Sequence, residues 1–220
     1  MSNLPHTYDY IIAGAGSSGL SLAWHMLHSD LRDKQILVVD KDLEPQNDKT
    51  WCFWEKNAPV FENVVQKKWD ESDIFVNGDH YHEQLIQYPY YSIRSGSYRA
   101  AILEELKTQP NITVLEAPIK KLSGSESFAE LNTEKETYRA EYIFQSCFKP
   151  HLKKRAQYPL IQHFLGWEVS TSDDVFDPSS FILMDFDETY GSGIAFMYVL
   201  PWSGNWHCLN TPSFPSSRKN

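Results

Sequence analysis

Two apolar runs near the N-terminus enclose a helix-forming segment. Residues 8–13 and 35–40 are almost continuously apolar and are predicted to be buried strands, with a helix at 17–28 between them. Near-continuous apolar strands on either side of a helix are typical of a parallel sheet that is covered on both faces. The pattern therefore predicts a strand–helix–strand unit, followed by a charged exit loop at 41–49.

Beyond the exit loop the chain becomes aromatic and mixed in character, which favours a second, antiparallel layer. One clear helix is predicted at 97–108, where Ser97 marks the start and Leu103 and Leu106 share a face. Residues 124–139 alternate weakly and are expected to form a surface meander. Further strands are predicted at 74–76, 111–116, 142–145, 164–171, 181–186 and 195–200.

Three glycines follow the first predicted strand and open the first predicted helix. In this G-x-G-x-x-G pattern Gly14 permits the tight turn, Gly16 lets a pyrophosphate approach the backbone, and Gly19 lets the helix pack closely on the strand. The pyrophosphate then lies at the helix N-terminus, where unpaired N–H groups and the positive end of the dipole meet it. Asp40 ends the second strand and is expected to bind the ribose hydroxyls, which favours FAD or NAD over NADP. The alternative is a tight structural corner without a ligand.

The layout of the elements favours FAD. An aromatic insert follows the first unit, and the next α/β elements begin only near Ser97, an order that resembles flavoproteins of the glutathione-reductase and hydroxylase type. In that group an arginine before the next helix often reaches the phosphates of the flavin nucleotide; Arg94 or Arg99 occupies this stretch, and either can equally be a surface charge. The expected cofactor-binding residues are Ala13, Gly14, Gly16, Ser17, Ser18, Gly19, Asp40 and Arg94.

The expected fold class is α/β: an FAD/NAD(P)-binding Rossmann-like domain with an antiparallel β substrate-binding layer, incomplete at the C-terminus. The expected segments are 1–50 (first βαβ unit), 51–96 (aromatic insert of the substrate layer), 97–150 (return to the FAD-binding domain), 151–203 (antiparallel substrate layer) and 204–220 (aberrant tail).

Composition narrows the classes of partner. The net charge of −9 and a single short basic cluster at 153–155 argue against nucleic acid. Three cysteines, Cys52, Cys147 and Cys208, form no C-x-x-C pair and no spacing suited to zinc, so we expect reduced, intracellular thiols and no metal site. No run approaches about 18 apolar residues, so no spanning segment is expected. The 14% aromatic content with 7 Trp suits an apolar ligand or a membrane interface.

The string DKTWCFW at 48–54 has an unusual order, which an aromatic cluster under a loop would not explain. Placed shortly after Asp40, it resembles the signature of lycopene β-cyclases, flavoproteins that close the ends of linear carotenes. The resemblance extends from about Tyr8 to Ser203. Three later segments are also similar to that family: 164–168 (FLGWE), 184–186 (MDF) and 196–201 (FMYVLP).

The resemblance implies a redox-neutral cyclisation of lycopene ends to the β-ionone rings of γ-carotene and β-carotene, with reduced FAD and with NADPH as electron donor. An acid protonates the terminal alkene, an internal double bond attacks the cation, and a proton is lost. The site must supply an acid in an apolar pocket that raises its pKa, and aromatic faces that stabilise the cation. The pocket candidates, each of which can instead be a core aromatic, are Trp51, Trp54, Tyr90, Trp167 and Tyr198.

The chain departs from the family after the Leu-Pro turn at 200–201. Family members carry their catalytic glutamate on the following strand, whereas residues 204–220 contain no glutamate and include Pro212 and Pro215. We therefore expect this tail to be a poor strand that leaves the sheet and the flavin site unfinished. Codons for 206–215 can spell a glutamate-containing strand in a shifted frame, so we expect a truncated product of an insertion or deletion near 204–206.

Asp185 and Asp187 remain as candidate catalytic acids near the expected site, and each can equally be a solvated acid at a strand end. Two other functions stay open: an FAD-dependent monooxygenase or dehydrogenase, and a non-catalytic fragment. Because carotenes reside in lipid, the resemblance implies a cytoplasmic protein that attaches to the membrane surface through apolar patches.

Overall fold

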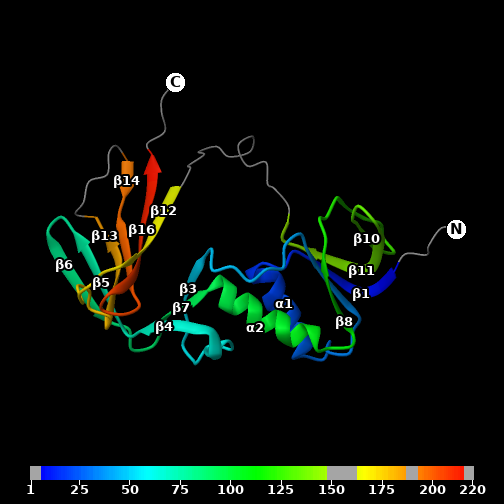
Figure 1. The fold of residues 1–220 in the computed structure, drawn as a ribbon, viewed down its shortest axis with the longest axis horizontal. Coiled ribbons are helices and arrows are strands. Elements are labelled where there is room, and N and C mark those ends of the chain that lie inside the picture. Colours follow the sequence, from blue (N-terminus) through cyan, green and yellow to red (C-terminus); the bar gives the residue numbers. More distant parts are fainter. Residues whose placement is uncertain (1–5, 148–162, 187–192, 216–220) are drawn as a thin grey trace, which may run out of the picture. The chain divides into compact units, whose positions relative to one another are not determined.

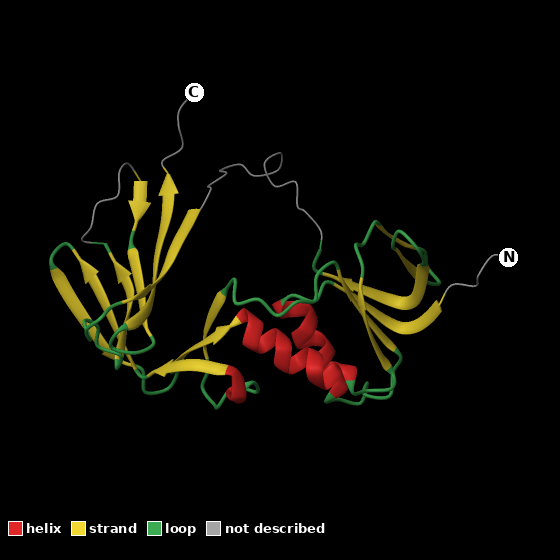
Figure 2. Ribbon diagram, viewed as in Figure 1, coloured by secondary structure: helices red, strands yellow, loops and turns green. Residues whose placement is uncertain are grey.

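The computed structural model describes residues 6–147, 163–186 and 193–215 (Figures 1 and 2). Contacts divide the chain into two units. The first comprises Met1–Thr50 and Arg94–Pro150, and the second comprises Trp51–Ile93 and His151–Asn220. Each unit is therefore built from two separate stretches of the sequence.

The first unit contains a six-stranded sheet in the order β8-β2-β1-β11-β10-β9. Its four strands from β8 to β11 are parallel, and β10 and β9 extend the sheet as an antiparallel meander, as the weak alternation at 124–139 predicted. The strands are β1 (His6–Ala13), β2 (Ile36–Asp40), β8 (Ile112–Glu116), β9 (Lys121–Gly124), β10 (Ala129–Asn132) and β11 (Thr137–Gln145).

The apolar runs become central strands because both of their faces are covered. Ile11 of β1 belongs to a buried cluster with Leu37, Val39 and residues of the meander strands, while the neighbouring Ile12 is equally buried. Two helices, α1 (Ser17–Leu27) and α2 (Ser95–Lys107), pack against each other in this unit (Figure 2), and the Trp24 indole N–H donates to a Glu105 carboxylate oxygen over 3.0 Å. The predicted strand–helix–strand start and the second helix are thus confirmed.

The second unit contains a seven-stranded sheet in the order β12-β16-β15-β13-β5-β6, with β14 beside β16, and a three-stranded sheet in the order β3-β7-β4. A 3₁₀ turn at Glu62–Val64 precedes β4. The strands are β3 (Thr50–Trp54), β4 (Val65–Trp69), β5 (Glu71–Val76), β6 (Asp79–Gln84), β7 (Tyr90–Arg94), β12 (His163–Ser170), β13 (Ser180–Asp185), β14 (Gly193–Ala195), β15 (Met197–Pro201) and β16 (Trp206–Pro215). The signature string forms β3, and the strand predicted at 195–200 is divided at Phe196.

An aromatic core joins the two sheets of this unit. Trp69 and Phe181 are 1% and 0% exposed, and their rings lie 5.5 Å apart. Tyr90 stacks on Phe181 at 4.5 Å, and the Trp69 indole N–H donates to the Pro201 carbonyl over 3.3 Å. Because β4 and β7 bring Trp69 and Tyr90 to β13 and β15, burial of these rings holds the sheets together.

The prediction that the tail is a poor strand which leaves the sheet unfinished is wrong, because residues 206–215 form β16, a strand inside the seven-stranded sheet. Leu209 is paired with Trp167 of β12 on one side and with Val199 of β15 on the other. Pro212 is paired with Phe164 of β12, beyond the last residue paired with β15, so its missing N–H does not interrupt that ladder. Backbone pairing on both sides makes this segment a strand despite its weak alternation.

We expect Leu209→Pro to lower the free energy of unfolding by at least about 2 kcal/mol, because proline removes an N–H from the centre of β16 and cannot match an interior strand. Urea unfolding followed by tryptophan fluorescence measures the effect, with Leu209→Val as the matched control. Equal stability of the two variants would contradict the placement of 206–215 as an interior strand.

Candidate functional site

The glycine loop between β1 and α1 contains two glycines that the fold requires. Gly14 has φ +116°, a region open mainly to glycine, and its N–H donates to the Val39 carbonyl over 2.8 Å. A Cβ on Gly19 would lie 1.8 Å from the Gly14 carbonyl oxygen and 3.2 Å from Ile12 Cγ2. Helix and strand therefore approach each other so closely that only a glycine fits at position 19.

Gly16 differs from the other two glycines. A Cβ there would meet no atom within 4 Å, and its φ of −77° is accessible to any residue. The packing of the protein itself thus gives no reason for a glycine at this position. A ligand that approaches the backbone of the loop does give one, as the sequence pattern predicts.

The start of α1 is suited to an anion. No side chain caps the helix, its first turn contains no acidic residue, and Gly16, Ser17 and Ser18 are exposed. N–H groups at an uncapped helix start and the positive end of the dipole attract phosphate. Ala13 lies just before the loop, is fully buried, and accepts a hydrogen bond from the Ser146 N–H over 2.9 Å. Ala13 therefore links the start of the loop to Ser146, which follows β11.

Asp40 lies at the end of β2 and turns its carboxylate toward the glycine loop. One oxygen accepts from the Ala15 N–H over 2.6 Å, and the other accepts from the Asp42 N–H over 3.3 Å. The structure thus brings the predicted ribose-binding acid to the predicted phosphate loop. Both features belong to the first unit.

Of the two arginines considered, Arg99 is the one that holds the loop. Its Nε and Nη2 donate to the Ala15 carbonyl over 3.3 and 3.1 Å, and its Nη1 donates to the Glu44 carbonyl over 3.0 Å. Arg94 precedes α2 and donates from Nη2 to the Asn47 carbonyl over 3.5 Å. Arg99 is therefore a positioning residue for the loop, a role that the sequence did not suggest, and contact of either arginine with the flavin phosphates stays a prediction.

Polar contacts at the start of α2 fix the loop that follows β2, and sequence reasoning missed them. The Ser95 hydroxyl donates to the Gln46 carbonyl over 2.7 Å, and the Gly96 N–H donates to Asn47 Oδ1 over 2.9 Å. A Cβ on Gly96 would lie 2.7 Å from that same Asn47 oxygen. The Ser95-Gly96 pair at the helix start is the signal that could have revealed this anchor.

In the second unit, three of the five predicted pocket aromatics meet. The Tyr90 and Tyr198 hydroxyls are 2.7 Å apart, and the Trp54 ring lies 4.4 Å from that of Tyr90. Phe181 lies beneath them, with its ring 6.1 Å from Trp54 and 6.5 Å from Tyr198. We call Trp54, Tyr90, Phe181 and Tyr198 the aromatic cluster.

The other two predicted pocket residues lie on different strands. Trp51 is half-buried on β3, and Trp167 is 48% exposed on β12, the edge strand of the large sheet. Neither is a member of the buried core beneath the aromatic cluster.

Cys52 completes the polar part of the aromatic cluster, although the sequence did not suggest it as a site residue. Its thiol is within hydrogen-bond reach of Tyr90 and Tyr198, and burial raises the pKa of Cys52 to about 11. Burial likewise raises the pKa of both tyrosines. All three groups are therefore neutral at pH 7, and the cluster presents aromatic faces and uncharged hydroxyl and thiol groups.

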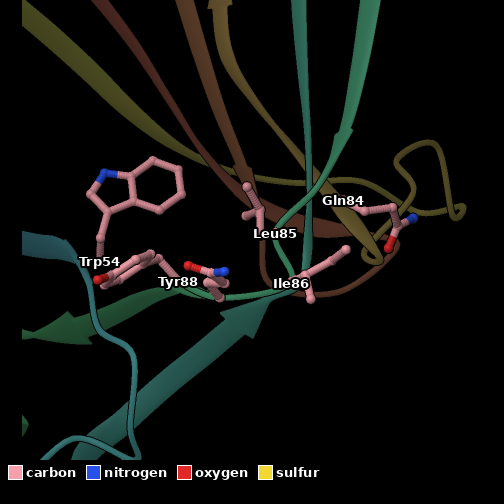
Figure 3. A pocket seen from close by; sticks show the side chains of 6 residues that line it. Trp54, Gln84, Leu85, Ile86 and Tyr88 are labelled. Carbon is pink, nitrogen blue, oxygen red and sulfur yellow. The ribbon is translucent and has the colours of Figure 1, made fainter.

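An apolar cavity of about 310 Å³ lies beside Trp54 (Figure 3). Leu85, Ile86 and Tyr88 are among its lining residues, and Ile86 is 89% exposed. Trp54 thus belongs both to the aromatic cluster and to this open cavity. The complete lining is Trp54, Gln84, Leu85, Ile86, Gln87 and Tyr88.

Asp185 is the last residue of β13, four positions beyond Phe181 and roughly 13 Å from it along a regular strand. The pairing of β13 is irregular between Ile182 and Asp185, where the register shifts against both neighbouring strands. Asp187 lies outside the described residues. Across the parts of the chain that the structure describes, no helix is long and apolar enough to cross a membrane.

Several solved structures share this fold at low sequence identity. A probable FAD-dependent monooxygenase, PqsL, from Pseudomonas aeruginosa is 16% identical with a TM-score of 0.65, and covers 96% of this chain and 61% of its own. A flavoprotein/dehydrogenase from Cytophaga hutchinsonii is 10% identical with a TM-score of 0.69, at 94% and 56% coverage. A geranylgeranyl bacteriochlorophyll reductase-like protein from Thermoplasma acidophilum is 11% identical with a TM-score of 0.70, at 96% and 57% coverage.

This chain thus spans less than two thirds of the length of each of these structures. The predicted fold class, α/β with an FAD/NAD(P)-binding Rossmann-like arrangement, is confirmed. No curated protein is similar enough in sequence to this chain to count as a match.

One protein family matches almost the whole chain. The family described as lycopene cyclase protein matches residues 9–217. The match includes β16, so the resemblance does not stop at Ser203 as expected from the sequence. The chain therefore belongs to the lycopene cyclase family.

Proposed function

We propose that this chain is a lycopene β-cyclase of carotenoid biosynthesis that binds FAD and lycopene and whose cyclisation of lycopene ends is limited by a missing acid. The family match over residues 9–217 carries the proposal, and the neutral aromatic cluster supports it. The reaction is an intramolecular isomerisation: the proton that the acid adds to the terminal alkene is balanced by the proton lost after ring closure.

The glycine loop fits an FAD cofactor. Gly16 leaves open space, and the N–H groups of Ser17 and Ser18 at the exposed helix start would hold the pyrophosphate. Asp40 would bind the ribose, and Arg94 would lie toward the phosphates. Reduced FAD, with NADPH as reductant, supplies negative charge that favours a cationic reaction.

The aromatic cluster is suited to stabilise the carbocation that forms during cyclisation. The faces of Trp54, Tyr90 and Tyr198 carry negative quadrupole charge, which stabilises a carbocation where water is excluded. The tyrosine hydroxyls hydrogen-bond each other, and they and the nearby Cys52 thiol are neutral at pH 7, so they offer no anion that would trap the cation. These residues bind and shield the reacting end of the substrate.

The acid is the incomplete part of the site. The family's glutamate has no counterpart in residues 204–220. We propose Asp185 as a poorly placed substitute proton donor, because it ends β13 about 13 Å along the strand from Phe181. A carboxyl group moved to another strand protonates the alkene less efficiently, since proton transfer depends on position.

Access to a lipid-dissolved substrate requires contact with a membrane surface. Ile86 and Tyr88 at the rim of the apolar cavity are 89% and 51% exposed, and Trp54 is 44% exposed. Aromatic and aliphatic side chains of this kind insert into the boundary between headgroups and acyl chains. We propose peripheral attachment through this rim.

An FAD-dependent monooxygenase is the second candidate, because PqsL, described as a probable enzyme of that class, shares the fold. A monooxygenase consumes oxygen and yields hydroxylated products. A cyclase yields rings with the elemental composition of lycopene, so product analysis separates the two functions.

We expect Gly16→Ala to weaken FAD binding at least about tenfold while it lowers the free energy of unfolding by about 1 kcal/mol or less. Gly19→Ala is the matched comparison, because its Cβ overlaps the Gly14 carbonyl and should cost about 1–3 kcal/mol. Flavin fluorescence titration and thermal unfolding measure the two effects. Unchanged FAD affinity in Gly16→Ala would count against a cofactor at this loop.

We expect the Cys52 thiol to resist alkylation at pH 8 because it is half-buried and its pKa is raised to about 11, whereas the exposed Cys147 should react at the rate of a free thiol. Peptide mapping after treatment with iodoacetamide measures both rates. In urea the two thiols should react alike, and fast alkylation of Cys52 in the folded protein would disprove a closed, water-poor cluster.

We expect a lycopene-producing host that expresses this chain to form little β-carotene or γ-carotene, and the same host with Asp185→Asn to form none, because Asp185 is the proposed proton donor. Chromatography of extracted carotenoids, with an empty vector as control, measures the products. Hydroxylated products would refute a cyclase, and equal ring formation by Asp185→Asn and the unaltered chain would refute Asp185 as the acid.

A further inference from the structure

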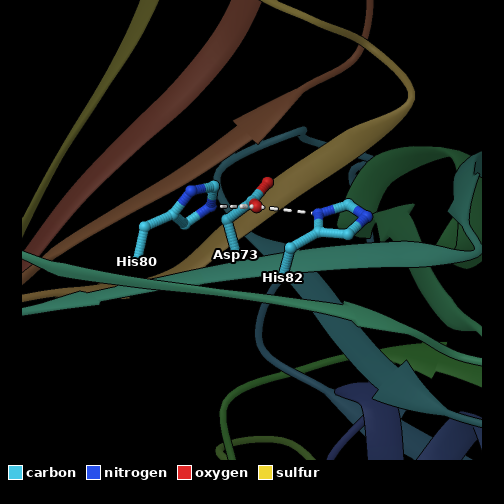
Figure 4. A group of neighbouring side chains, drawn as sticks. All are labelled: Asp73, His80 and His82. Atoms are coloured by element: carbon cyan, nitrogen blue, oxygen red, sulfur yellow. Dashed lines mark hydrogen bonds and ion pairs between the residues drawn. The ribbon is translucent and has the colours of Figure 1, made fainter.

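Three side chains converge on one face of the β5–β6 hairpin, in a part of the second unit that the proposed reaction does not use. His80 and His82 are two positions apart on β6, so their side chains point to the same face. Asp73 of β5 lies directly opposite His82 in the antiparallel register. The hairpin alone thus assembles a carboxylate and two imidazoles (Figure 4).

The geometry brings their ligand atoms together. Asp73 Oδ1 lies 2.6 Å from His80 Nε2 and 2.9 Å from His82 Nδ1. The three potential ligand atoms, one from each residue, all lie within 4.8 Å of one another. Figure 4 shows both imidazoles turned toward the same carboxylate oxygen from opposite sides. Small side-chain rotations are enough to place one ion about 2.0–2.2 Å from all three atoms.

A second ring of contacts orients these residues. The Ser180 hydroxyl of β13 donates to Asp73 Oδ2, the oxygen that the histidines do not use. The ring of Phe75 stacks on His80 at 4.4 Å, and a Glu71 oxygen lies 3.8 Å from His82 Nε2. Supporting partners of this kind hold metal ligands in place and increase their basicity.

We propose that Asp73, His80 and His82 form a binding site for a divalent transition-metal ion, with Zn²⁺ as its preferred occupant. Two imidazoles and one carboxylate are ligands that Zn²⁺ favours, and three protein ligands leave a fourth position for water. The histidines are about half exposed and Asp73 is 16% exposed, so the ion has an open path to a carboxylate that the protein has already positioned.

The site has a structural consequence for β6. This strand lies at the edge of the seven-stranded sheet, and all six of its residues are exposed. A metal ion that joins β6 to Asp73 of β5 links the edge strand to its neighbour. The bound ion therefore raises the free energy of unfolding. The spacing of cysteines and histidines along the chain does not reveal the site, because the register of a hairpin brings Asp73 to His82.

The test is Zn²⁺ titration of the purified full chain in competition with a chromophoric chelator. We expect one Zn²⁺ per chain and a raised unfolding midpoint. His82→Ala should weaken binding at least about tenfold because one of three ligands is lost, and Ser180→Ala should weaken it by about 10–100-fold through a misoriented Asp73. His25→Ala, which removes an exposed histidine on α1, is the matched control and should bind as the unaltered chain does.

Co²⁺ substitution identifies the ligands independently, because cysteine ligation produces intense thiolate charge-transfer absorption that histidine and carboxylate ligands lack. We expect no such absorption in the 1:1 complex. Equal Zn²⁺ affinity in His82→Ala and His25→Ala, a thiolate band, or no binding by the unaltered chain would each overturn the proposal and leave Asp73 with its two histidines as an ion-pair network only.

Discussion

The close approach of α1 to β1 is the constraint on which the first unit depends. The Cβ that Gly19 lacks would lie 1.8 Å from the Gly14 carbonyl oxygen, so helix and strand meet at backbone distance. This contact fixes where the helix begins and therefore where its free N–H groups point. Asp40 and Arg99 then fasten the loop from two sides through Ala15. The exposed, uncapped start of α1 is therefore a consequence of packing.

The second unit rests on a different interaction, the burial of large rings between two sheets. Trp69 and Phe181 are almost fully buried, and Tyr90 stacks on Phe181. Burial of several aromatic side chains contributes a large part of the stability of such a unit. The same burial raises the pKa of Cys52 and of the two tyrosine hydroxyls, since a charged form would lose its hydration. Stability and suitability for a cationic reaction therefore arise from the same residues.

The centre and the edge of the large sheet differ in how many neighbouring strands pair with each strand. At the centre, β16 is a strand because β12 and β15 pair with it on both sides, even though its sequence alternates poorly. At the edge, β6 has a fully exposed pattern, and among the described strands it pairs only with β5. The cluster of Asp73, His80 and His82 lies at this edge. Additional bonds between β5 and β6 would stabilise the sheet most here, because an edge strand has one neighbour.

The sequence by itself determined the first unit, because its signals are local. Continuous apolar strands, a glycine pattern at a strand-to-helix turn and an acid at the next strand end each depend on near neighbours, and so does the string that resembles lycopene cyclases. Only the tertiary structure decided the strand character of 206–215, the choice of Arg99 as the residue that holds the loop, and the meeting of Trp54, Tyr90 and Tyr198. These features depend on which strands become neighbours in the sheet, and residues far apart in the chain supply each partner, so no local pattern could specify them.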